Sequence, residues 1–363
     1  AIFRSGNIQN IISIDPFSVE KTEILFGSAS VIYGSDAIGG VINIKTLNPK
    51  LTISDNYIFS TNAITRFSSA NKEKTIHADI MYGKKKFGFV SSFSYNDFGD
   101  LKMGKHGPHE YLRHFYVVRQ GENDVIVENE NPYIQVPSGY SQFSAVNKIR
   151  FKPNNKIDFI IGSNFSQTSE YSRYDRHIRY KNDLPRYGRW DYGPQIWAMH
   201  FLNVSYTSKN IFFDEINFIA AHQIFGESRI SRDINKTEEL TRIEKVNALS
   251  VNIDFTKNIN RRNRVFYGIE YVKNYVESNG INKNIITGVS EEGAARYPNS
   301  DWTSYAFFVS NNFKFSDFVR VQLGLRYNYY SLNAAFDTTF YPFPFTTAEI
   351  LSLIHISEPT RPY

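Results

Sequence analysis

Hydrophobic and polar residues alternate with a period of two along most of the chain after about residue 50. In the stretch FVRVQLGLRYNYY, the odd positions from Val319 to Tyr329 are apolar or aromatic, and the even positions from Arg320 to Asn328 are polar or glycine. A period of two with one apolar face is typical of a β-strand. The same rule predicts about eleven strands, near residues 56–67, 74–83, 86–96, 141–152, 156–167, 195–207, 210–225, 244–257, 263–276, 302–315 and 318–331.

The connections between these segments alternate in length. Short polar turns are expected near 83–86, 153–156, 207–210, 260–264 and 316–317, and longer connections at 68–73, 97–140, 168–194, 226–243 and 277–301. An up-and-down meander gives this alternation when all turns of one kind lie at one end, as in outer-membrane barrels. The pattern therefore predicts an all-β fold, a transmembrane antiparallel up-and-down β-barrel. Inward-facing charges such as Lys148, Arg150, Asp254, Arg320 and Arg326 are then expected to face the lumen.

A soluble β-sandwich or a β-propeller is the alternative fold. A sandwich prefers Val, Ile and Leu on its buried face, and a propeller shows an internal repeat of about 40–50 residues. This sequence has no such repeat, and loops as long as 97–140 are uncommon in compact soluble domains unless they are functional.

Composition narrows the class of protein further. Aromatic residues make up 16% of the 363 residues, with 30 Phe and 24 Tyr, which favours β structure. The absence of cysteine excludes disulfides, thiol nucleophiles and cysteine-zinc sites. A formal net charge of +5 is too weak and too dispersed for a nucleic-acid partner. No nucleophile, base and oxyanion donor stand together, so we expect no enzyme, no catalytic residues, no metal site and no intrinsic cofactor.

The segment EILFGSASVIYGSDAIGGVINIKT, from Glu23 to Thr46, concentrates glycines before a strand-like run. A phosphate-binding P-loop needs Lys and then Ser or Thr after its last glycine, but Gly40 is followed by Val41. A dinucleotide-binding loop follows a strand and opens a helix, which is the opposite order. The glycines are therefore interpreted as positions of tight turns and close backbone approach.

Extended to Val19, this segment closely resembles the end of the plug domain of TonB-dependent outer-membrane receptors. In that family a Val-Glu-x-Ile-Glu-Val-x-x-Gly-like strand precedes a Tyr-Gly turn and a Gly-Gly-Val-Ile-Asn-Ile strand. Thr22 stands where an apolar residue is more usual. The match assigns a structural or gating role in the plug to Gly27, Tyr33, Gly34, Gly39, Gly40 and Asn43.

The resemblance implies a domain organisation. Residues 1–50 would be the C-terminal part of the plug, and residues 51–350 the N-terminal half of the barrel. A complete barrel in this family has about twenty-two strands, so the chain is expected to be a fragment. The stretch LSLIHISEPTR resembles a translated sequencing adapter, and residues 351–363 are therefore expected to be a non-native tail.

The resemblance also implies a function. Such receptors lie in the outer membrane of Gram-negative bacteria and import scarce nutrients with energy supplied by TonB and its inner-membrane complex. The expected cargo is an iron compound, either a ferric siderophore or haem, and the expected partners are TonB, this cargo and outer-membrane lipid. The alternatives are a passive porin or surface adhesin barrel, and a soluble β-rich protein that binds or hydrolyses carbohydrate.

Two long connections supply candidate ligand-binding residues. Residues 169–194 interleave arginines with aromatic rings, which suits an anionic aromatic ligand. The alternative is that these rings pack the loop and the arginines pair with Asp175, Asp183 and Asp191, or with anionic lipid. The candidates here are Tyr171, Arg173, Tyr174, Arg176, His177, Arg179, Arg189 and Trp190.

The connection 97–140 adds three histidines and a tyrosine. Neutral imidazole and Tyr can both ligate haem iron, so these residues are candidates for a haem receptor. The simpler alternative is that they are solvated. The candidates are His106, His109, Tyr111 and His114.

Overall fold

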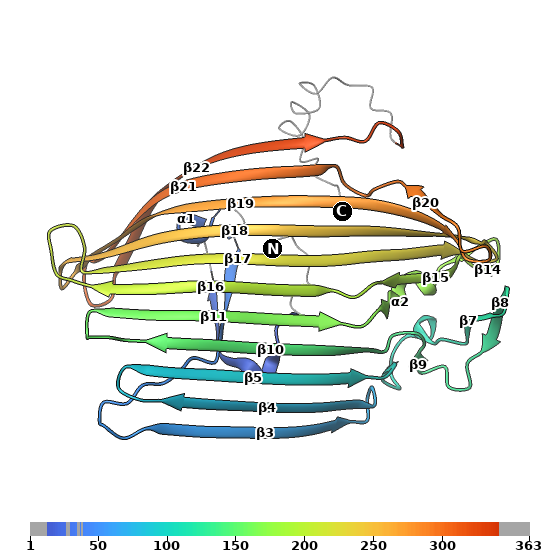
Figure 1. The fold of residues 1–363 in the computed structure, drawn as a ribbon, viewed down its shortest axis with the longest axis horizontal. Coiled ribbons are helices and arrows are strands. Elements are labelled where there is room, and N and C mark those ends of the chain that lie inside the picture. Colours follow the sequence, from blue (N-terminus) through green and yellow to red (C-terminus); the bar gives the residue numbers. More distant parts are fainter. Residues whose placement is uncertain (1–12, 27–29, 35–36, 38, 341–363) are drawn as a thin grey trace.

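In a computed structural model the chain forms one curved wall of antiparallel strands with a small hairpin on its inner side (Figure 1). The structure describes residues 13–26, 30–34, 37 and 39–340. Gly27 and the expected adapter tail at 351–363 lie outside these residues. No helix among the described residues is both long and apolar enough to cross a membrane.

Eleven strands form the wall, and their spatial order follows the chain order from one edge to the other. Each strand pairs antiparallel with the next one, which confirms the predicted up-and-down meander. The strands are β3 (Ile58–Ser68), β4 (Glu73–Gly83), β5 (Phe87–Phe98), β10 (Tyr140–Phe151), β11 (Ile157–Thr168), β16 (Ile196–Thr207), β17 (Glu215–Asp233), β18 (Glu238–Asn260), β19 (Asn263–Asn284), β21 (Asn299–Lys314) and β22 (Arg320–Ala335).

Three strands run well beyond their predicted ends. The segment 226–243 was predicted to be a long connection, but Gly226 to Ser231 pair with Lys245 to Leu240 in a continuous ladder. β19 likewise continues to Asn284, inside the predicted connection 277–301. The wall therefore projects at this end as a sheet, and only a tight turn at 234–237 joins β17 to β18.

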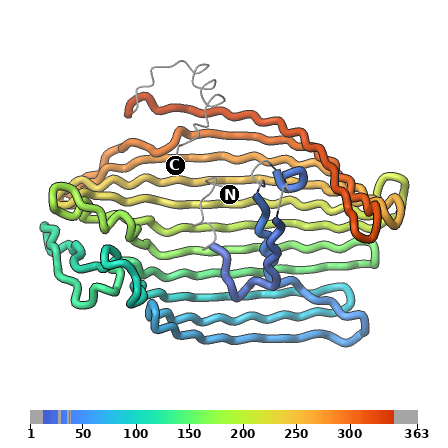
Figure 2. The backbone as a smooth tube through the Cα atoms, turned by 180° about the vertical axis from the view of Figure 1, so that it is seen from behind, coloured from blue at the N-terminus to red at the C-terminus, as the bar shows by residue number. Residues whose placement is uncertain are grey.

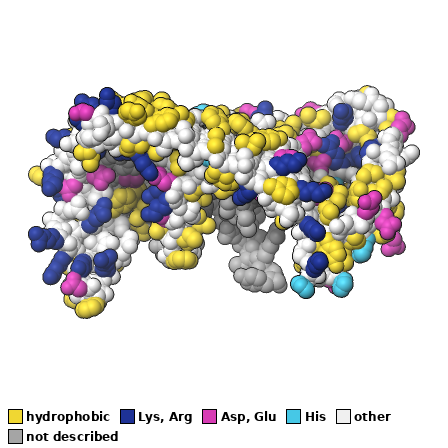
Figure 3. Space-filling view, turned by 90° about the horizontal axis from the view of Figure 1, so that it is seen from below, with side chains coloured by type: hydrophobic (Ala, Val, Ile, Leu, Met, Phe, Trp, Pro, Cys, Tyr) yellow, Lys and Arg dark blue, Asp and Glu magenta, His cyan; other side chains and the backbone are white. Residues whose placement is uncertain are grey.

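Side chains alternate between an outer and an inner face of the wall. On β22 the predicted apolar set is exposed on one face: Val321, Leu323 and Leu325 have 40%, 70% and 76% of their surface exposed. Hydrophobic side chains gather along the upper edge of Figure 3, and Lys and Arg side chains gather at its left end. This alternation is what a barrel needs when one face meets lipid and the other meets a lumen.

The connections divide between the two ends as predicted. Short turns join β4 to β5, β10 to β11, β18 to β19 and β21 to β22 at one end, and the longest connections lie at the other, which we call the loop end (Figure 1). The loops there contain β6 (Leu101–Lys102), η3 (His109–Tyr111), β7 (Phe115–Gln120), β8 (Asn123–Glu128), β9 (Ile134–Gln135), β12 (Tyr171–Ser172), α2 (Tyr174–His177), β13 (Tyr180–Lys181), β14 (Leu184–Pro185), β15 (Tyr187–Tyr192) and β20 (Ser290–Gly293).

The glycine-rich segment forms a separate hairpin that crosses the wall on its inner side (Figure 2). The elements are η2 (Pro16–Ser18), β1 (Val19–Phe26), α1 (Ser30–Tyr33) and β2 (Gly40–Thr46), and β1 pairs antiparallel with β2. Gly34 follows α1 with φ +96°, and Gly40 opens β2 with φ +149°. Both values lie where residues with a Cβ are strained, so the predicted backbone role of these glycines is confirmed.

The wall holds this hairpin largely through backbone carbonyls. The Lys148 ammonium donates to the Thr46 carbonyl at 2.9 Å, and the Arg150 guanidinium donates to the Pro49 carbonyl at 3.2 Å. From β22, the Arg326 guanidinium donates to the Ile32 carbonyl of α1 at 3.2 Å. Lys148, Arg150 and Arg326 therefore face inward, as predicted.

A further contact buries a polar network between η2 and the wall. The Ser94 hydroxyl donates to the Asp15 carboxylate at 2.7 Å and lies 2.7 Å from Nδ1 of His77. The other His77 nitrogen is 3.1 Å from the Asp79 carboxylate, and the Phe17 ring stacks on the imidazole at 5.2 Å. Only 1% of the His77 surface is exposed, so this network fixes where η2 meets the wall.

Replacing Gly40 should weaken the hairpin, whereas the same change at Gly39 should not. A Cβ at Gly40 would lie 2.5 Å from the Leu25 carbonyl oxygen, but at Gly39 it would meet nothing within 4 Å. We expect Gly40→Ala to cost about 1–3 kcal/mol of hairpin stability. Trypsin cleavage after Lys21 or Lys45 in the folded protein measures the effect. Equal cleavage in the two variants would contradict this account.

Candidate functional site

The loop between β11 and β16 is built as a continuation of the wall. β15 pairs with the projecting part of β17, from Tyr192 opposite Arg229 to Tyr187 opposite Asp233, and β12 pairs with β15 in turn. Successive side chains of β15 therefore point to opposite faces. The candidate residues of this loop are divided between an inner and an outer surface.

The inner surface carries arginines and aromatic rings in alternation. Register is unbroken along β17 from Ala221, which lines a cavity with Ile42 of the hairpin, to Arg229. Arg229 and the side chain opposite it, Tyr192, therefore face inward. We call the set Arg176, Trp190, Arg173, Tyr192 and Arg229 the arginine–aromatic ladder.

The ladder is held by cation–π contacts between neighbours. The Arg176 and Arg173 guanidinium carbons lie 5.7 and 5.3 Å from the Trp190 ring centre. Arg173 and Arg229 lie 6.0 and 5.4 Å from the centre of Tyr192. Tyr171 extends the set, because its ring lies 5.3 Å from Tyr192. Tyr192 and Arg229 are buried, with 1% and 9% of their surfaces exposed, whereas Arg173, Arg176 and Trp190 are half-buried and are the members that the inner surface presents.

Acidic residues neutralise only part of the ladder's charge. Arg173 donates to Asp175 at 2.7 Å and to the Tyr192 hydroxyl at 3.2 Å. Burial works to lower the pKa of Arg173, but these hydrogen bonds raise it above its ordinary value, so the group stays charged. The alternative prediction was that arginines of this loop pair with its own acidic residues. Arg173 does pair with Asp175, and the Arg176 guanidinium lies 3.7 Å from the same carboxylate.

The outer surface of the same loop holds a network of charges around Arg189. This guanidinium donates to Asp191 at 2.7 Å, to Glu170 at 2.6 Å and to Glu239 at 3.2 Å. His177 Nε2 lies 3.0 Å from the Trp190 carbonyl oxygen and 3.7 Å from the Asp191 carboxylate. Arg189 and His177 are therefore structural ties of the loop, and both line a cavity of about 650 Å³.

A second tie fixes the hairpin of β7 and β8 against this outer surface. The Asp124 carboxylate accepts from Arg232 at 2.6 and 2.8 Å, from Arg119 at 3.2 Å and from the Asn235 backbone amide at 2.7 Å. The Asp124 side chain is fully buried. Gly188 allows the close approach, because a Cβ there would lie 2.6 Å from this carboxylate. The two longest loops are thereby joined to one strand extension.

The remaining candidates are not gathered with the ladder. His106, His109, Tyr111 and His114 are all exposed, and histidine side chains gather at the tip of the loop end in Figure 3. The side chains of these four residues make no hydrogen bond within the described part of the chain. The described residues also contain no group of three or more His, Cys, Asp or Glu side chains that could hold a metal ion. Arg179 is also exposed, and Tyr174 lies 5.8 Å from the Arg113 guanidinium.

Two members of the ladder were not among the predicted site residues. Arg229 comes from β17, in a segment expected to be a loop, and Tyr192 lies in the predicted loop 169–194 without being chosen as a candidate. No local pattern identifies them, because the pairing of β15 with β17 joins residues far apart in sequence. Asp124 and Arg232, which hold the loops together, escaped prediction for the same reason.

Comparison with known proteins shows which family and which solved structures this chain resembles. A family model described as TonB dependent receptor-like, beta-barrel matches residues 120–348, and a TonB-dependent receptor plug domain matches residues 3–41. Among solved structures, the copper transporter OprC is 12% identical with a TM-score of 0.68, covering 88% of this chain and 44% of that one. The FrpB iron transporter from Neisseria meningitidis is 15% identical with a TM-score of 0.60, covering 88% and 47%.

The pyoverdine outer membrane receptor FpvA from Pseudomonas aeruginosa PAO1, bound to pyoverdine, is also similar. It is 12% identical with a TM-score of 0.57, covering 87% of this chain and 46% of that one. Identities this low show the fold alone. The chain spans less than half the length of each of these three structures.

Asp124→Asn should release the β7–β8 hairpin while the wall stays folded. Removing one partner of a buried ion pair costs about 3–5 kcal/mol, because the remaining charge is left without compensation. We expect trypsin to cleave after Arg119 much faster than in the wild type. Asp317→Asn is the matched control, since Asp317 pairs with Lys314 on an exposed turn where its side chain is 86% exposed. Equal cleavage in all three proteins would rule out the tie.

Protonating Asp191 should loosen β15. Burial works to raise the pKa of Asp191, but the nearby His177 imidazole and hydrogen bonds from Arg189 and Ser172 lower it to about 2. Its stabilisation is therefore complete above the unfolded pKa near 4 and is lost as pH falls through about 2. It contributes about 2 kcal/mol, so Asp191→Asn should lower the hydrogen-exchange protection of β15 amides about 30-fold at pH 6. The difference should shrink near pH 2, and a pH-independent difference would contradict this assignment.

Proposed function

Because this chain belongs to the TonB-dependent receptor family, we propose that it is part of an outer-membrane receptor that imports an iron compound with energy supplied through TonB. Receptors of this family lie in the outer membrane of Gram-negative bacteria, contact TonB and bind small molecules such as siderophores. The location of this chain, its dependence on TonB and its cargo are the proposed steps. No intrinsic cofactor is part of the proposal, because the iron complex is cargo.

The observation that carries the choice of ligand is the arginine–aromatic ladder. It lies at the loop end on the inner face, where a ligand entering the barrel from outside would meet it. Guanidinium groups suit carboxylates and catecholates, and flat rings suit aromatic ligand surfaces. An anionic, aromatic ferric siderophore matches both features. Arg173 and Arg176 would supply positive charge, and Trp190 a stacking surface.

Haem is the weaker choice for this surface. The ladder contains no histidine, and the exposed His106, His109 and His114 lie outside it. Iron ligation by one of them would need the 99–139 loop to carry it toward the lumen, whereas Asp124 holds this loop against the outer surface. We therefore favour a ferric siderophore over haem, and the growth experiment below includes both.

The alternative functions fit the fold less well. A passive porin needs an open lumen, but the hairpin crosses the inner face and is held there by Lys148 and Arg326. A soluble carbohydrate-binding protein would have to leave an extended apolar face in water. Phe93, Phe143 and Ile161, on the outer face of three neighbouring strands, illustrate that face, with 46%, 40% and 60% of their surfaces exposed. Such a face suits a lipid environment.

Growth under iron starvation tests the function. The complete gene that encodes this chain is deleted, and the strain is supplied with one ferric siderophore or with haem as its sole iron source, with and without TonB. Loss of growth on a siderophore alone, reproduced by loss of TonB, is the expected result. Unchanged growth on every source would overturn the iron assignment. Loss of growth on haem alone would show that the receptor imports haem instead of a siderophore.

Trp190→Leu should weaken binding of the ferric siderophore identified in that growth experiment. It removes the ring shared by Arg173 and Arg176, and each cation–π contact contributes about 0.5–2 kcal/mol. We expect the Kd of the complete receptor for this siderophore to rise about 5- to 30-fold. Lys181→Gln, an exposed change in the same loop, is the control. Equal Kd values for Trp190→Leu and the wild type would remove the ladder from the binding site.

A further inference from the structure

Two lysines lie directly opposite each other at the end of the wall that carries the short turns. Phe87 of β5 pairs with Phe151 of β10. The register continues by one residue, because the Lys152 amide donates to the Lys86 carbonyl oxygen at 2.8 Å. Residues opposite each other in this way have Cα atoms about 5.5 Å apart and direct their side chains to the same face. We call Lys86 and Lys152 the lysine pair.

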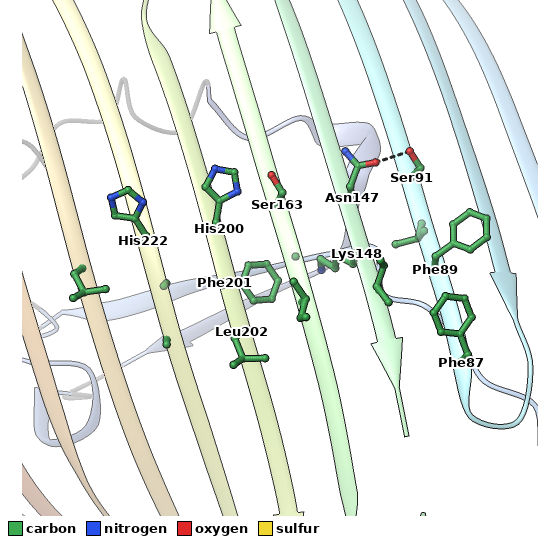
Figure 4. A pocket seen from close by; sticks show the side chains of 17 residues that line it. Phe87, Phe89, Ser91, Asn147, Lys148, Ser163, His200, Phe201, Leu202 and His222 are labelled. Carbon is green, nitrogen blue, oxygen red and sulfur yellow. Dashed lines mark hydrogen bonds between the residues drawn. The ribbon is translucent and has the colours of Figure 1, made fainter. Parts of the chain in front are cut away.

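The lysine pair faces the inner side of the wall. In Figure 4 the hairpin passes behind the wall, and Phe87 lies on the near side at the start of β5, so Lys86 is turned inward by the alternation along the strand. Lys152 lies two residues beyond Arg150, which reaches inward to a carbonyl oxygen of the linker that joins the hairpin to β3. This linker comprises residues 47–57. The lysine pair is therefore on the same side of the wall as the linker.

Neither member of the lysine pair has an acidic partner within the part of the chain that the structure describes. Two acidic side chains of this region contact other cations. Asp55 lies 2.6 Å from Lys85, and the Asp158 carboxylate accepts from Arg150 at 2.6 Å. Lys and Arg side chains gather at this end of the wall (Figure 3). Like charges directly opposite each other destabilise a sheet, and the described residues leave this repulsion uncompensated.

The lysine pair lines a cavity of about 430 Å³ between the linker and two short turns. Of the described residues that line it, four are cations and none is acidic. The linker contributes residues 51–53, and the turn after β10 contributes Asn154. The Asn154 side-chain oxygen accepts from the backbone amides of Lys156 and Ile157 at 2.8 and 3.0 Å, which leaves its amino group as a further donor. The volume lies within the range of about 300–1,000 Å³ that is usual for small-molecule sites.

We propose that this cavity binds a phosphate group. Lysine ammonium groups are compact point charges that bind phosphate well. An anion between Lys86 and Lys152 replaces their mutual repulsion by attraction to both, and the Asn154 amino group donates to another of its oxygens. Free phosphate and the headgroup of a phospholipid both carry this group. Ile53 also lines the cavity with 99% of its surface exposed, and would give the chains of a lipid an apolar contact.

A bound phosphate would connect the linker to the wall. The linker already lies close to β5, because a Cβ on Gly88 would be 3.2 Å from the side chains of Pro49 and Leu51. Residues 51–53 form one side of the cavity, and the lysine pair forms another. Occupancy of the site should therefore reduce the motion of the linker between the hairpin and β3. This inference depends neither on the cargo nor on the arginine–aromatic ladder.

Calorimetric titration of the complete receptor with inorganic phosphate tests the site, with sodium chloride of equal ionic strength as the blank. The double variant Lys86→Gln with Lys152→Gln should bind phosphate about 30-fold more weakly or worse, because it removes both charged donors. Lys156→Gln is the matched control and should bind like the wild type, since Lys156 is exposed on the same turn but does not line the cavity. Absence of phosphate binding by the wild type, or equal binding by the double variant, overturns the proposal.

Lys86→Glu separates ligand binding from a purely structural role of the lysine pair. Without phosphate this variant gives Lys152 an acidic partner, so its Tm should be no lower than that of the wild type. With phosphate in excess, the wild type should gain stability by mass action and the variant should not. Hydrogen exchange of the amides of residues 51–56 should likewise slow with phosphate in the wild type alone. Equal effects of phosphate on both proteins would contradict the assignment.

Lipid composition identifies the source of the phosphate group. The titration is repeated in nanodiscs of phosphatidylcholine, with and without phosphatidylglycerol, at an ionic strength that screens the charge of the membrane. A headgroup in the site competes with free phosphate, so a higher apparent Kd in the nanodiscs that contain phosphatidylglycerol assigns the site to lipid. Equal Kd values in the two membranes assign it to free phosphate. Loss of phosphate binding in both membranes overturns the site itself.

Discussion

The continuous antiparallel register of the wall determines what each side chain can contact. From β3 to β22 each strand pairs with the next, and the pairing assigns alternate residues to opposite faces. Lys148 reaches the hairpin because it belongs to the inner set, whereas its neighbour Asn147 belongs to the outer set and accepts a hydrogen bond from Ser91 of β5. A shift of register by one residue would exchange the two faces, so the contacts of Lys148 and Arg326 with the hairpin depend on this pairing.

Contacts from the wall to backbone carbonyls explain why the hairpin motif is rich in glycine. Lys148 and Arg326 hold the hairpin through the carbonyl oxygens of Thr46 and Ile32, which any residue would supply. What the motif must supply is a backbone that turns tightly. Gly34 and Gly40 do this at positive φ, and α1 lies so near β22 that a Cβ on Gly324 would be 2.7 Å from Val31. The glycines of this motif are therefore explained by the backbone conformation that the hairpin needs.

Local pattern predicted the strands of the wall well and the loop end poorly. All eleven predicted strands are present, because alternation between an apolar outer side and an inward-facing side is visible within one segment. At the loop end this alternation disappears. Gly226 to Asp233 reads as a polar loop although it continues β17, since both faces there are polar or covered by other loops. The interleaving of arginines and aromatic rings in residues 169–194 is visible in the sequence, but how they are arranged depends on the pairing of β15 with β17, which only the folded chain shows.

Because β15 pairs with β17, its outer face anchors the loop and its inner face carries the arginine–aromatic ladder. On the outer face, Arg189 and Asp191 join the loop to β18, and Asp124 adds the neighbouring hairpin to β17. On the inner face, Trp190 and Tyr192 hold the arginines in an ordered stack. A ligand that meets an ordered surface loses less free energy to the immobilisation of side chains. The buried charges of the outer face thus stabilise a loop whose inner face presents the half-buried Arg173, Arg176 and Trp190 in a fixed arrangement, and a purely flexible loop would not offer that preorganisation.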